Sequence, residues 1–484
     1  MFLGIDLGTS SVKALLIDGE QRIVASASAP VELSRPHDGW SEQDPADWIA
    51  ATETALAALK QEQAAAMAAV RGIGLSGHMH GATLLGDDDA VLRPCIMWND
   101  VRSHAEAAAL DADPRFREIT GNIVFPGFTA PKLVWVRNNE PDTFAKVRKV
   151  LLPKDYLRLW LTGEHISEMS DSAGTSWLDT GARAWSGDLL AATGLGEEHM
   201  PALVEGSEPG GRLRGDIASR FGLETGIVVA GGAGDNAAAA IGMGTVHDGS
   251  AFASLGTSGV LFAANDAYSP NPASAVHAFC HAIPATWHQM GVILSATDAL
   301  NWYAKLVGKD PAALTGGLGD MLEPPSGVAF LPYLSGERTP HNDAAIRGVF
   351  AGLGHDDDTA ALTRAVMEGV CFAFRDCLEA LREAGTTLGR VTAVGGGSRS
   401  DYWLKLMATV LGVPVELPAD GDFGAAFGAA RLGLMAAEGA SPAAVCTPPA
   451  VQKTHEPDRA MMSAFDDAYG RYRALYPAIK GVLA

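Results

Sequence analysis

The sequence is poor in cysteine, in aromatic residues and in positive charge. It has 5 cysteines among 484 residues, an odd number with no C-x-x-C pair, which is typical of a reduced, cytoplasmic protein without structural disulfides. There are 36 lysines and arginines against 57 aspartates and glutamates, a net charge of −21, and this disfavours nucleic acid as a partner. One nucleotide pocket is still allowed, because backbone N–H groups can hold phosphate without net positive charge.

Membrane-spanning and secretory segments are also missing. Residues 267–297 contain no charged side chain, but prolines and polar residues interrupt them, so they do not predict a membrane helix. The start, MFLGIDLGTSSVK, has no basic segment before an apolar core and does not resemble a signal peptide. No G-x-x-x-x-G-K-[ST] motif occurs, so a nucleotide would not be held by a P-loop. We therefore expect a globular cytoplasmic protein that binds neither nucleic acid nor membrane.

Two copies of one pattern predict the fold. Segments 2–17 and 251–262 each contain an apolar strand, the tetrapeptide L-G-T-S and a second apolar strand. The copies lie about half a chain apart, which favours duplication into two related domains over a solenoid, with chance similarity as the alternative. Strands alternate with helices in each half. We therefore expect two α/β domains with mixed sheets, 1–245 and 246–484, and a ligand site in the cleft between them.

The L-G-T-S turns are candidate phosphate sites. In the first turn, small residues around Thr9 would let a phosphate approach the backbone, and Asp6 at its base could hold a divalent cation. In the second turn, Gly256 and Thr257 would grip the same phosphates from the other side. Ordinary hairpins, with a charged residue beside one of them, are the alternative.

Two glycine-rich junctions between a strand and a helix are further candidates. Asp235 follows strand 227–230 and a glycine run, where an alanine-rich helix is predicted to begin. It is either a cap of that helix or a general base facing the cleft, and spacing alone does not separate the two. The triplet Gly395, Gly396 and Gly397 either lies against a flat ligand or forms a simple turn.

Two other motifs are interpreted as structural. The G-x-G-x-x-G sequence at 72–77 starts inside a predicted strand, 70–76, and no helix follows, which disfavours a dinucleotide site. His277, Cys280 and His281 resemble zinc ligands but lack a second ligand pair, which disfavours zinc.

Together these motifs resemble the FGGY family of carbohydrate kinases, in the actin-like superfamily, over nearly the whole chain. Segment 127–135, GFTAPKLVW, is similar to the first family signature. Segments 348–353 and 362–368 are similar to the second, which departs at Ala361. Five stretches resemble family members that phosphorylate D-xylulose: 39–45, 78–83, 98–102, 152–157 and 333–341.

The resemblance implies a fold and a reaction. The fold would consist of two actin-like (ribonuclease H-like) α/β domains, with mixed sheets flanked by helices and the active site in the interdomain cleft. The reaction would be phosphorylation of a small-molecule sugar, D-xylulose at O5, with ATP and Mg²⁺ as cofactors. The alternatives are another ketose or polyol, such as ribulose or glycerol, and an actin-like ATPase or sugar sensor. The oligomeric state, a homodimer included, is left open.

The resemblance also implies residue roles. Asp235 would be the catalytic base, and Asp6 would place the magnesium and assist catalysis. Sugar contacts would come from five side chains: Met79, His80, Trp98, Asn99 and Asn236. Nucleotide contacts would come from six residues of the glycine-rich turns: Thr9, Gly256, Thr257, Gly395, Gly396 and Gly397. Without the resemblance, His80 and Trp98 would be interpreted as packed side chains.

Overall fold

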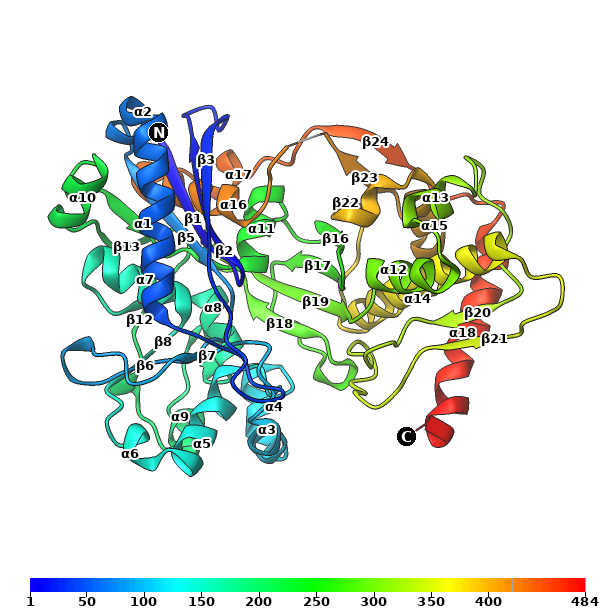
Figure 1. The fold of residues 1–484 in the computed structure, drawn as a ribbon, viewed down its shortest axis with the longest axis horizontal. Coiled ribbons are helices and arrows are strands. Elements are labelled where there is room, and N and C mark those ends of the chain that lie inside the picture. Colours follow the sequence, from blue (N-terminus) through cyan, green and yellow to red (C-terminus); the bar gives the residue numbers. More distant parts are fainter. Residues whose placement is uncertain (420, 484) are drawn as a thin grey trace.

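Two mixed sheets organise the chain, one in each half (Figure 1). The computed structural model describes residues 1–419 and 421–483. The first sheet contains, in spatial order, β13 (Pro209–Arg212), β14 (Val228–Ala230), β5 (Gly72–Gly77), β1 (Phe2–Leu7), β2 (Ser11–Ile17) and β3 (Ile23–Pro30), with β15 (Ala233–Gly234) paired to β5. The second contains β18 (His277–Cys280), β19 (Trp287–Ile293), β17 (Gly259–Asn265), β16 (Ala251–Leu255), β22 (Val391–Val394), β23 (Val415–Pro418) and β24 (Val451–His455).

The two sheets share one pairing scheme. β1 pairs antiparallel with β2 and parallel with β5, while β16 pairs antiparallel with β17 and parallel with β22. Each copy of L-G-T-S runs from the end of one strand into the turn of such a hairpin. The structure therefore confirms the predicted α/β fold with mixed sheets, and the repeated sequence occupies equivalent places in the two sheets.

Shorter strand pairs and helices complete the two halves. The pairs are β4 (Glu42–Gln43) with β7 (Cys95–Ile96), β6 (Thr83–Leu85) with β8 (Lys149–Leu151), β9 (Ile166–Glu168) with β12 (Ala202–Val204), β10 (Leu178–Asp179) with β11 (Ala184–Trp185), and β20 (Ala329–Leu331) with β21 (Val349–Ala351). Helices of the first half are α1 (Pro45–Glu62), α2 (Ala64–Ala68), α3 (His104–Asp111), α4 (Pro114–Thr120), α5 (Thr129–Asn139), α6 (Pro141–Phe144), α7 (Pro153–Thr162), α8 (Met169–Ser172), α9 (Gly187–Thr193), α10 (Gly215–Phe221) and α11 (Asp235–Met243). Helices of the second half are α12 (Thr297–Val307), α13 (Pro311–Gly316), α14 (Thr359–Glu383), α15 (Asp401–Leu411), α16 (Ala425–Glu438), α17 (Pro442–Val445) and α18 (Met462–Leu483). In the described part of the chain, no helix combines the length and apolar character needed to cross a bilayer.

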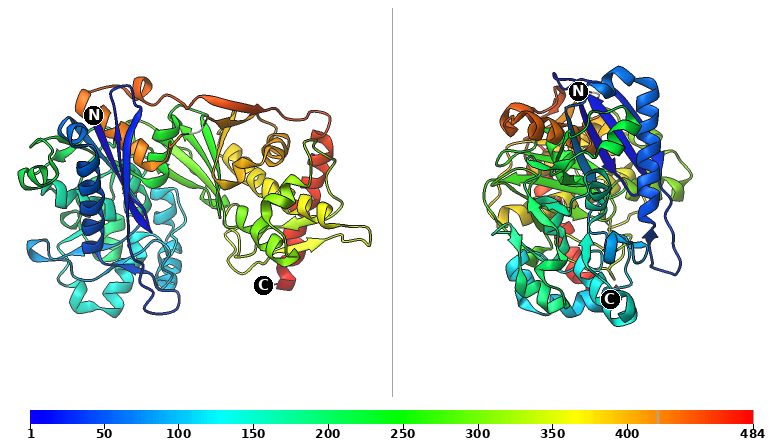
Figure 2. Two further views of the ribbon diagram at one scale, coloured as in Figure 1. Left: turned by 45° about the horizontal axis from the view of Figure 1, so that its top comes forward. Right: turned by 90° about the vertical axis from the view of Figure 1, so that its left-hand side faces the viewer.

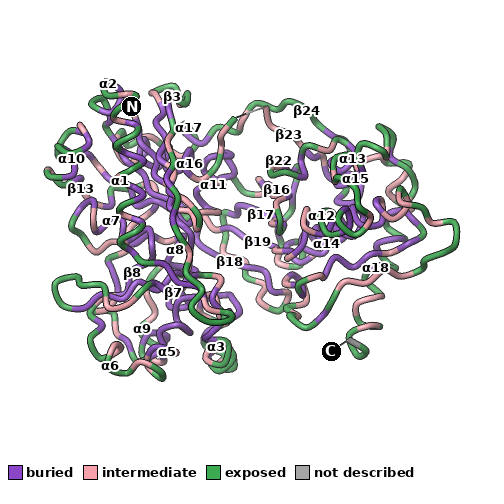
Figure 3. Tube along the Cα trace, viewed as in Figure 1, coloured by how far each residue is buried: buried purple, intermediate pink, exposed green. Residues whose placement is uncertain are grey.

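The side-chain alternation of β1 explains which helices cover each face of the first sheet. Leu3, Ile5 and Leu7 belong to a buried core that includes residues of α1, α7 and α10. Phe2 belongs to a second core, with residues of α11 and α16. Because strand side chains alternate, Asp6 is assigned to this second face. Buried positions follow the central strands of both sheets, and exposed positions follow outer helices and loops (Figure 3).

Helix α16 belongs to the second half of the sequence but lies on the first sheet (Figure 1). Glycine makes the approach possible, because a β-carbon at Gly74 would overlap the carbonyl of Ala429, and one at Gly428 would overlap the carbonyl of Ala238. The G-x-G-x-x-G segment is therefore a packing surface, and no helix opens from it, as predicted. The N-terminus lies on the first half and the C-terminus at the end of α18 on the second (Figure 2).

Candidate active site

The ends of three neighbouring strands bring the two predicted catalytic carboxylates to the same edge of the first sheet. Asp6, near the end of β1, is in register with Ser76 of β5, and Ser76 is in register with Ala233 of β15. Asp235 follows β15 directly, because α11 begins there. Asp6 and Asp235 are close enough that the charge of Asp6 contributes to the pKa of Asp235.

The carboxylate of Asp235 does not cap α11. Gly234 is the capping residue and makes no side-chain contact, while Asp235 is the first helical residue. Its Oδ1 accepts the backbone N–H of Asn236 at 2.7 Å and the Asn236 side-chain amide at 3.0 Å. Burial, and then the charge of Asp6, raise the pKa of Asp235 to about 6, so the carboxylate is a stronger base than an exposed one. The structure therefore does not show the side-chain cap that the sequence allowed at Asp235.

A buried ionic cluster supports the backbone before Asp235. The N–H of Gly234 donates to the hydroxyl of Ser170 at 3.1 Å, and Ser170 stands in a short helix capped by the carboxylate of Glu168. The ammonium of Lys154 lies 2.5 Å from Asp155, 3.5 Å from Glu168 and 3.4 Å from Asp171, and all four side chains are fully buried. The three carboxylates share one ammonium, and burial raises the pKa of Glu168 and Asp171. Through these shared contacts Lys154 can hold α8 and the start of α11 in place.

The carboxylate of Asp6 is available for a ligand. Its Oδ1 is buried and accepts no hydrogen bond from the described residues, and burial raises its pKa. Lys13, opposite Asp6 in the β1–β2 register, forms an ion pair with Asp422 in the segment before α16. An orphaned carboxylate oxygen is the kind of group that a divalent cation or its water would satisfy.

His80 presents a neutral imidazole with one free acceptor. Its Nδ1 lies 2.7 Å from the carbonyl oxygen of Gly174, and a carbonyl only accepts, so Nδ1 carries the proton. Burial and the nearby Lys132 lower the pKa of His80 to about 3, which leaves Nε2 as an acceptor at neutral pH. The carbonyl of His80 accepts from the ammonium of Lys132 at 2.8 Å and from the hydroxyl of Thr129 at 3.1 Å. These donors hold a backbone with φ of +71°, which is uncommon for a residue with a side chain.

Met79 and two aromatic rings surround His80. Met79 is buried against Gly234, where a β-carbon would lie 2.8 Å from the Met79 Cγ. The ring of Phe128 stacks on His80 with centroids 4.5 Å apart, and Phe279 of the second half lies 6.3 Å away. The wall of this site is therefore built from both halves.

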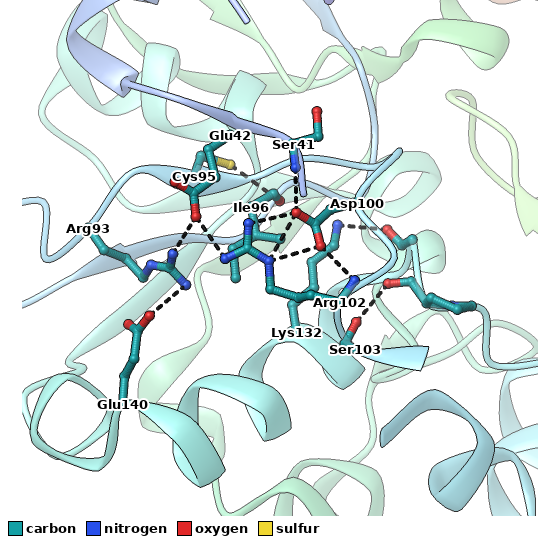
Figure 4. A network of polar contacts seen from close by, with 12 residues as sticks. Ser41, Glu42, Arg93, Cys95, Ile96, Asp100, Arg102, Ser103, Lys132 and Glu140 are labelled. Carbon is teal, nitrogen blue, oxygen red and sulfur yellow. Dashed lines mark hydrogen bonds and ion pairs between the residues drawn. The ribbon is translucent and has the colours of Figure 1, made fainter. Parts of the chain in front are cut away.

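Trp98 links the predicted sugar and phosphate residues. Its side chain is 46% exposed, so it is not a core aromatic, and its indole N–H donates to the hydroxyl of Thr9 at 3.0 Å. The next residue, Asn99, has a buried Oδ1 without a partner among the described residues. Asp100 then accepts hydrogen bonds from the guanidinium of Arg102, which also forms an ion pair with Glu42 at 2.7 Å (Figure 4). This network fixes the loop that carries Trp98.

The predicted nucleotide residues of the second half lie together. Gly395 has φ of +92°, and a β-carbon there would lie 2.7 Å from the carbonyl oxygen of Leu255, next to Gly256. Thr297 donates its N–H to the carbonyl of Gly256 at 2.9 Å, which fixes the turn that Thr257 continues. Two cavities flank the glycine triplet, of about 350 and 720 Å³. The larger also includes Ala239 and Met243 of α11, so it lies between the two halves.

Sequence reasoning missed residues that shape the site from a distance. Lys132 lies inside the segment 127–135 that resembles the first family signature, which was a usable signal. No sequence signal identified Gly174 and Phe279, because their contacts with His80 join segments far apart in the chain.

Comparison with known families matches both halves of the chain. The N-terminal domain of the FGGY family of carbohydrate kinases matches residues 1–242, and its C-terminal domain matches residues 251–437. The chain belongs to the FGGY family. Relatives of this FGGY kinase include the xylulose kinase of Escherichia coli (strain K12), 46% identical over 100% of both chains, and that of Klebsiella pneumoniae, 47% identical over 95% of both.

Solved structures agree with this family assignment. A xyloylose kinase from Brucella ovis superposes with a TM-score of 0.98 at 67% identity, covering 99% of both chains. A xylulose kinase from Rhodospirillum rubrum gives a TM-score of 0.92 at 30% identity, covering 100% of this chain and 99% of the other. The predicted two-domain, actin-like fold of an FGGY kinase is thus confirmed.

Proposed function

We propose that this FGGY kinase transfers the γ-phosphate of ATP to O5 of D-xylulose. The observation that carries the proposal is the place of Asp235, a half-buried carboxylate with a raised pKa at the sheet edge that also presents Asp6 and leads into the His80 loop. The substrate follows from relatives named xylulose kinases that are 46–47% identical over nearly the whole chain.

The sugar would lie between the His80 loop and the start of α11. The free Nε2 of His80 would accept a hydrogen bond from a hydroxyl group of the sugar, and the buried side chain of Met79 would pack beside it. Asn236 would contact the sugar next to Asp235, while Trp98 and Asn99 would border it from the loop held by Arg102. Because His80 stays neutral at physiological pH, the acceptor role of its Nε2 would not change with pH in that range.

Asp235 would act as the general base. A primary hydroxyl is a weak nucleophile, and phosphoryl transfer depends mainly on positioning and charge stabilisation. The carboxylate would accept the O5 proton as the bond to phosphorus forms. Its N–H bonds from Asn236 leave Oδ2 for that proton. The N-terminal end of α11 would favour the negative charge that develops beside it.

The ATP would lie across the two L-G-T-S turns, with Thr9 and the Gly256–Thr257 turn facing the phosphates. The adenosine would lie along Gly395, Gly396 and Gly397, and the smaller cavity, lined by Leu300, Trp403 and Asn301 among others, combines apolar walls with a few polar groups as nucleoside sites do. The orphaned Oδ1 of Asp6 fits a magnesium ion, which would neutralise phosphate charge when bound. The described residues contain no group of three or more His, Cys, Asp or Glu that could hold a metal, so phosphate and water would supply its other ligands.

Sugar-dependent ADP release tests this proposal. With ATP and Mg²⁺, we expect D-xylulose to give the highest kcat/KM in a panel that includes D-ribulose, glycerol and xylitol. Asp235→Asn should lower kcat by roughly 10²–10⁴-fold, the range of a positioned acid–base group. Asp248→Asn, at an exposed aspartate after α11, serves as the control and should leave kcat unchanged. ADP release that no sugar stimulates would exclude a sugar kinase, and a preferred sugar other than D-xylulose would replace the substrate.

A further inference from the structure

A guanidinium from the second half lies against the aromatic wall of the sugar site. Arg338 stands in the segment between β20 and β21, and its Cζ lies 4.3 Å from the ring centroid of Phe125 in the first half. Its Nη1 lies 3.3 Å from Nε2 of His277. Arginine only donates, so His277 accepts with Nε2 and is neutral. Arg338 therefore bridges the two halves at this wall.

Two aromatic rings, Phe125 and Phe128, connect Arg338 to His80 along this wall. Phe125 contacts both Phe128 and His277, with centroid distances of 5.4 and 5.3 Å, and Phe128 stacks on His80. The charge of Arg338 is one of the contributions that lower the pKa of His80. The guanidinium is thus close enough for its charge to act on the imidazole that faces the proposed sugar.

The guanidinium forms no direct ion pair in the described part of the chain, and the charge of Glu337 opposes the lowering of the Arg338 pKa by burial only in part. Among residues 1–419 and 421–483, no carboxylate forms an ion pair with Arg338, and only Nη1 of its side chain has a hydrogen-bond partner. The neighbouring Glu337 turns its Oε1 to the backbone N–H groups of Leu294 and Arg338 instead. By contrast, the buried guanidinium of Arg158 donates to three backbone carbonyls. The other donors of the Arg338 side chain, Nε and Nη2, are not buried, so they are accessible to water or to a ligand in the cleft.

The backbone around Arg338 is fixed before any ligand binds. Thr339 exchanges hydrogen bonds with Val292 of β19, through its N–H to the Val292 carbonyl and through its hydroxyl from the Val292 N–H, both at 3.0 Å. The Glu337 backbone pairs with Asp343 at 2.9 and 2.8 Å. The second sheet therefore sets the position from which the arginine reaches the first half, which limits the entropy lost on binding.

We propose that Arg338 is a specificity-determining residue that contacts the ketose at the end opposite to O5. This inference rests on the proposed function. The guanidinium fork matches two adjacent oxygens, and the C1 hydroxyl and C2 carbonyl of a ketose are such a pair. His80 would accept a hydrogen bond from a hydroxyl group, and Arg338 would donate one to the carbonyl. The sugar would then be held from both halves, so that its binding favours their approach.

Paired substrates test this assignment. Arg338→Met should lower kcat/KM for D-xylulose by about 10- to 100-fold, mainly through KM, because a hydrogen bond from a charged donor is lost. For 1-deoxy-D-xylulose, which lacks O1, the same substitution should cost clearly less, because one of the two contacts is already absent. Arg338→Lys, which keeps the charge without the fork, should fall between wild type and Arg338→Met.

The matched control is Arg347→Met in the same segment. Arg347 is exposed and donates to the carbonyls of Ala344, Ala345 and Ile346, so its loss disturbs the loop without removing a cleft cation. We expect its sugar KM to stay within about twofold of wild type. Equal fold-losses on both sugars in Arg338→Met, or constants like those of wild type, would overturn the inference. Failure of the proposed function is distinct, because wild-type enzyme would then show no turnover of D-xylulose.

Discussion

Asp6 and Asp235 of this FGGY kinase lie at the same edge of the first sheet, but their carboxylates have different environments. Asp6 keeps a buried oxygen without a partner, while Asp235 accepts two hydrogen bonds from Asn236 and has a pKa near 6. Both residues are predictable from sequence as candidates, because Asp6 lies near the end of a strand that leads into a small-residue turn and Asp235 directly follows a strand and a glycine run. The backbone of His80 is not predictable, because Lys132 and Thr129 hold its carbonyl from a segment about fifty residues away.

The pH dependence of turnover should report Asp235. A base must be deprotonated to accept the O5 proton, so kcat/KM for D-xylulose should be flat above the pKa of about 6 and fall below it, by about tenfold per pH unit. Initial rates measured from about pH 5 to pH 9 would show this decrease of kcat/KM at low pH. Thermal unfolding over the same range controls for loss of structure. A flat profile down to pH 5 would contradict the raised pKa.

Helices and strands of this protein pack closely where a glycine leaves no side chain between them. The glycines at 72 and 74 predict a strand that admits a close neighbour, but the sequence does not identify α16 as that neighbour, because α16 lies more than 350 residues later. Local patterns fix the hairpins and the start of α11. The partner of a glycine-lined surface depends on the folded chain as a whole.

Gly428→Ala should destabilise the protein. The added methyl would overlap the carbonyl of Ala238, so α16 and α11 must separate, which costs about 1–3 kcal/mol or more in a packed core. Differential scanning calorimetry should show a lower Tm. Gly470→Ala in α18 is the matched control, because that position is exposed with no neighbour for a β-carbon, and alanine favours a helix by up to about 1 kcal/mol. An unchanged Tm for Gly428→Ala would show that the contact yields without strain.

At the scale of the whole molecule, contacts across the two halves surround the site. Besides α16, Asn122 exchanges hydrogen bonds with the backbone of Ala278 at 2.9 and 3.0 Å, and Lys13 forms an ion pair with Asp422. The sequence repeat predicts two sheets of one design. It does not predict these contacts, because the repeat carries no information on how the copies meet.

The fragment 1–245, taken at the predicted domain boundary, should not fold stably by itself. Without α16 it would expose the glycine-lined face of β1 and β5 and the apolar side of α11, including Ala238 and Ile241. Limited proteolysis should digest the fragment under conditions in which the full chain resists. Extending the fragment through a short linker to residues 425–438 should restore resistance. A protease-resistant, cooperatively unfolding fragment 1–245 would show that α16 is dispensable for the first sheet.

The close packing of α16 on the glycines of β1 and β5 also limits where the enzyme can bend. Backbone packed on backbone leaves no side chain to rearrange, so α16 has to travel with the first sheet as one rigid piece. Because Val445, Cys446 and Thr447 also pack on the first half, opening of the cleft would be absorbed at hinges after α11, before α16 and after α17. One of those hinges carries Asp422, so releasing its ion pair with Lys13 would loosen the joint beside the phosphate turn.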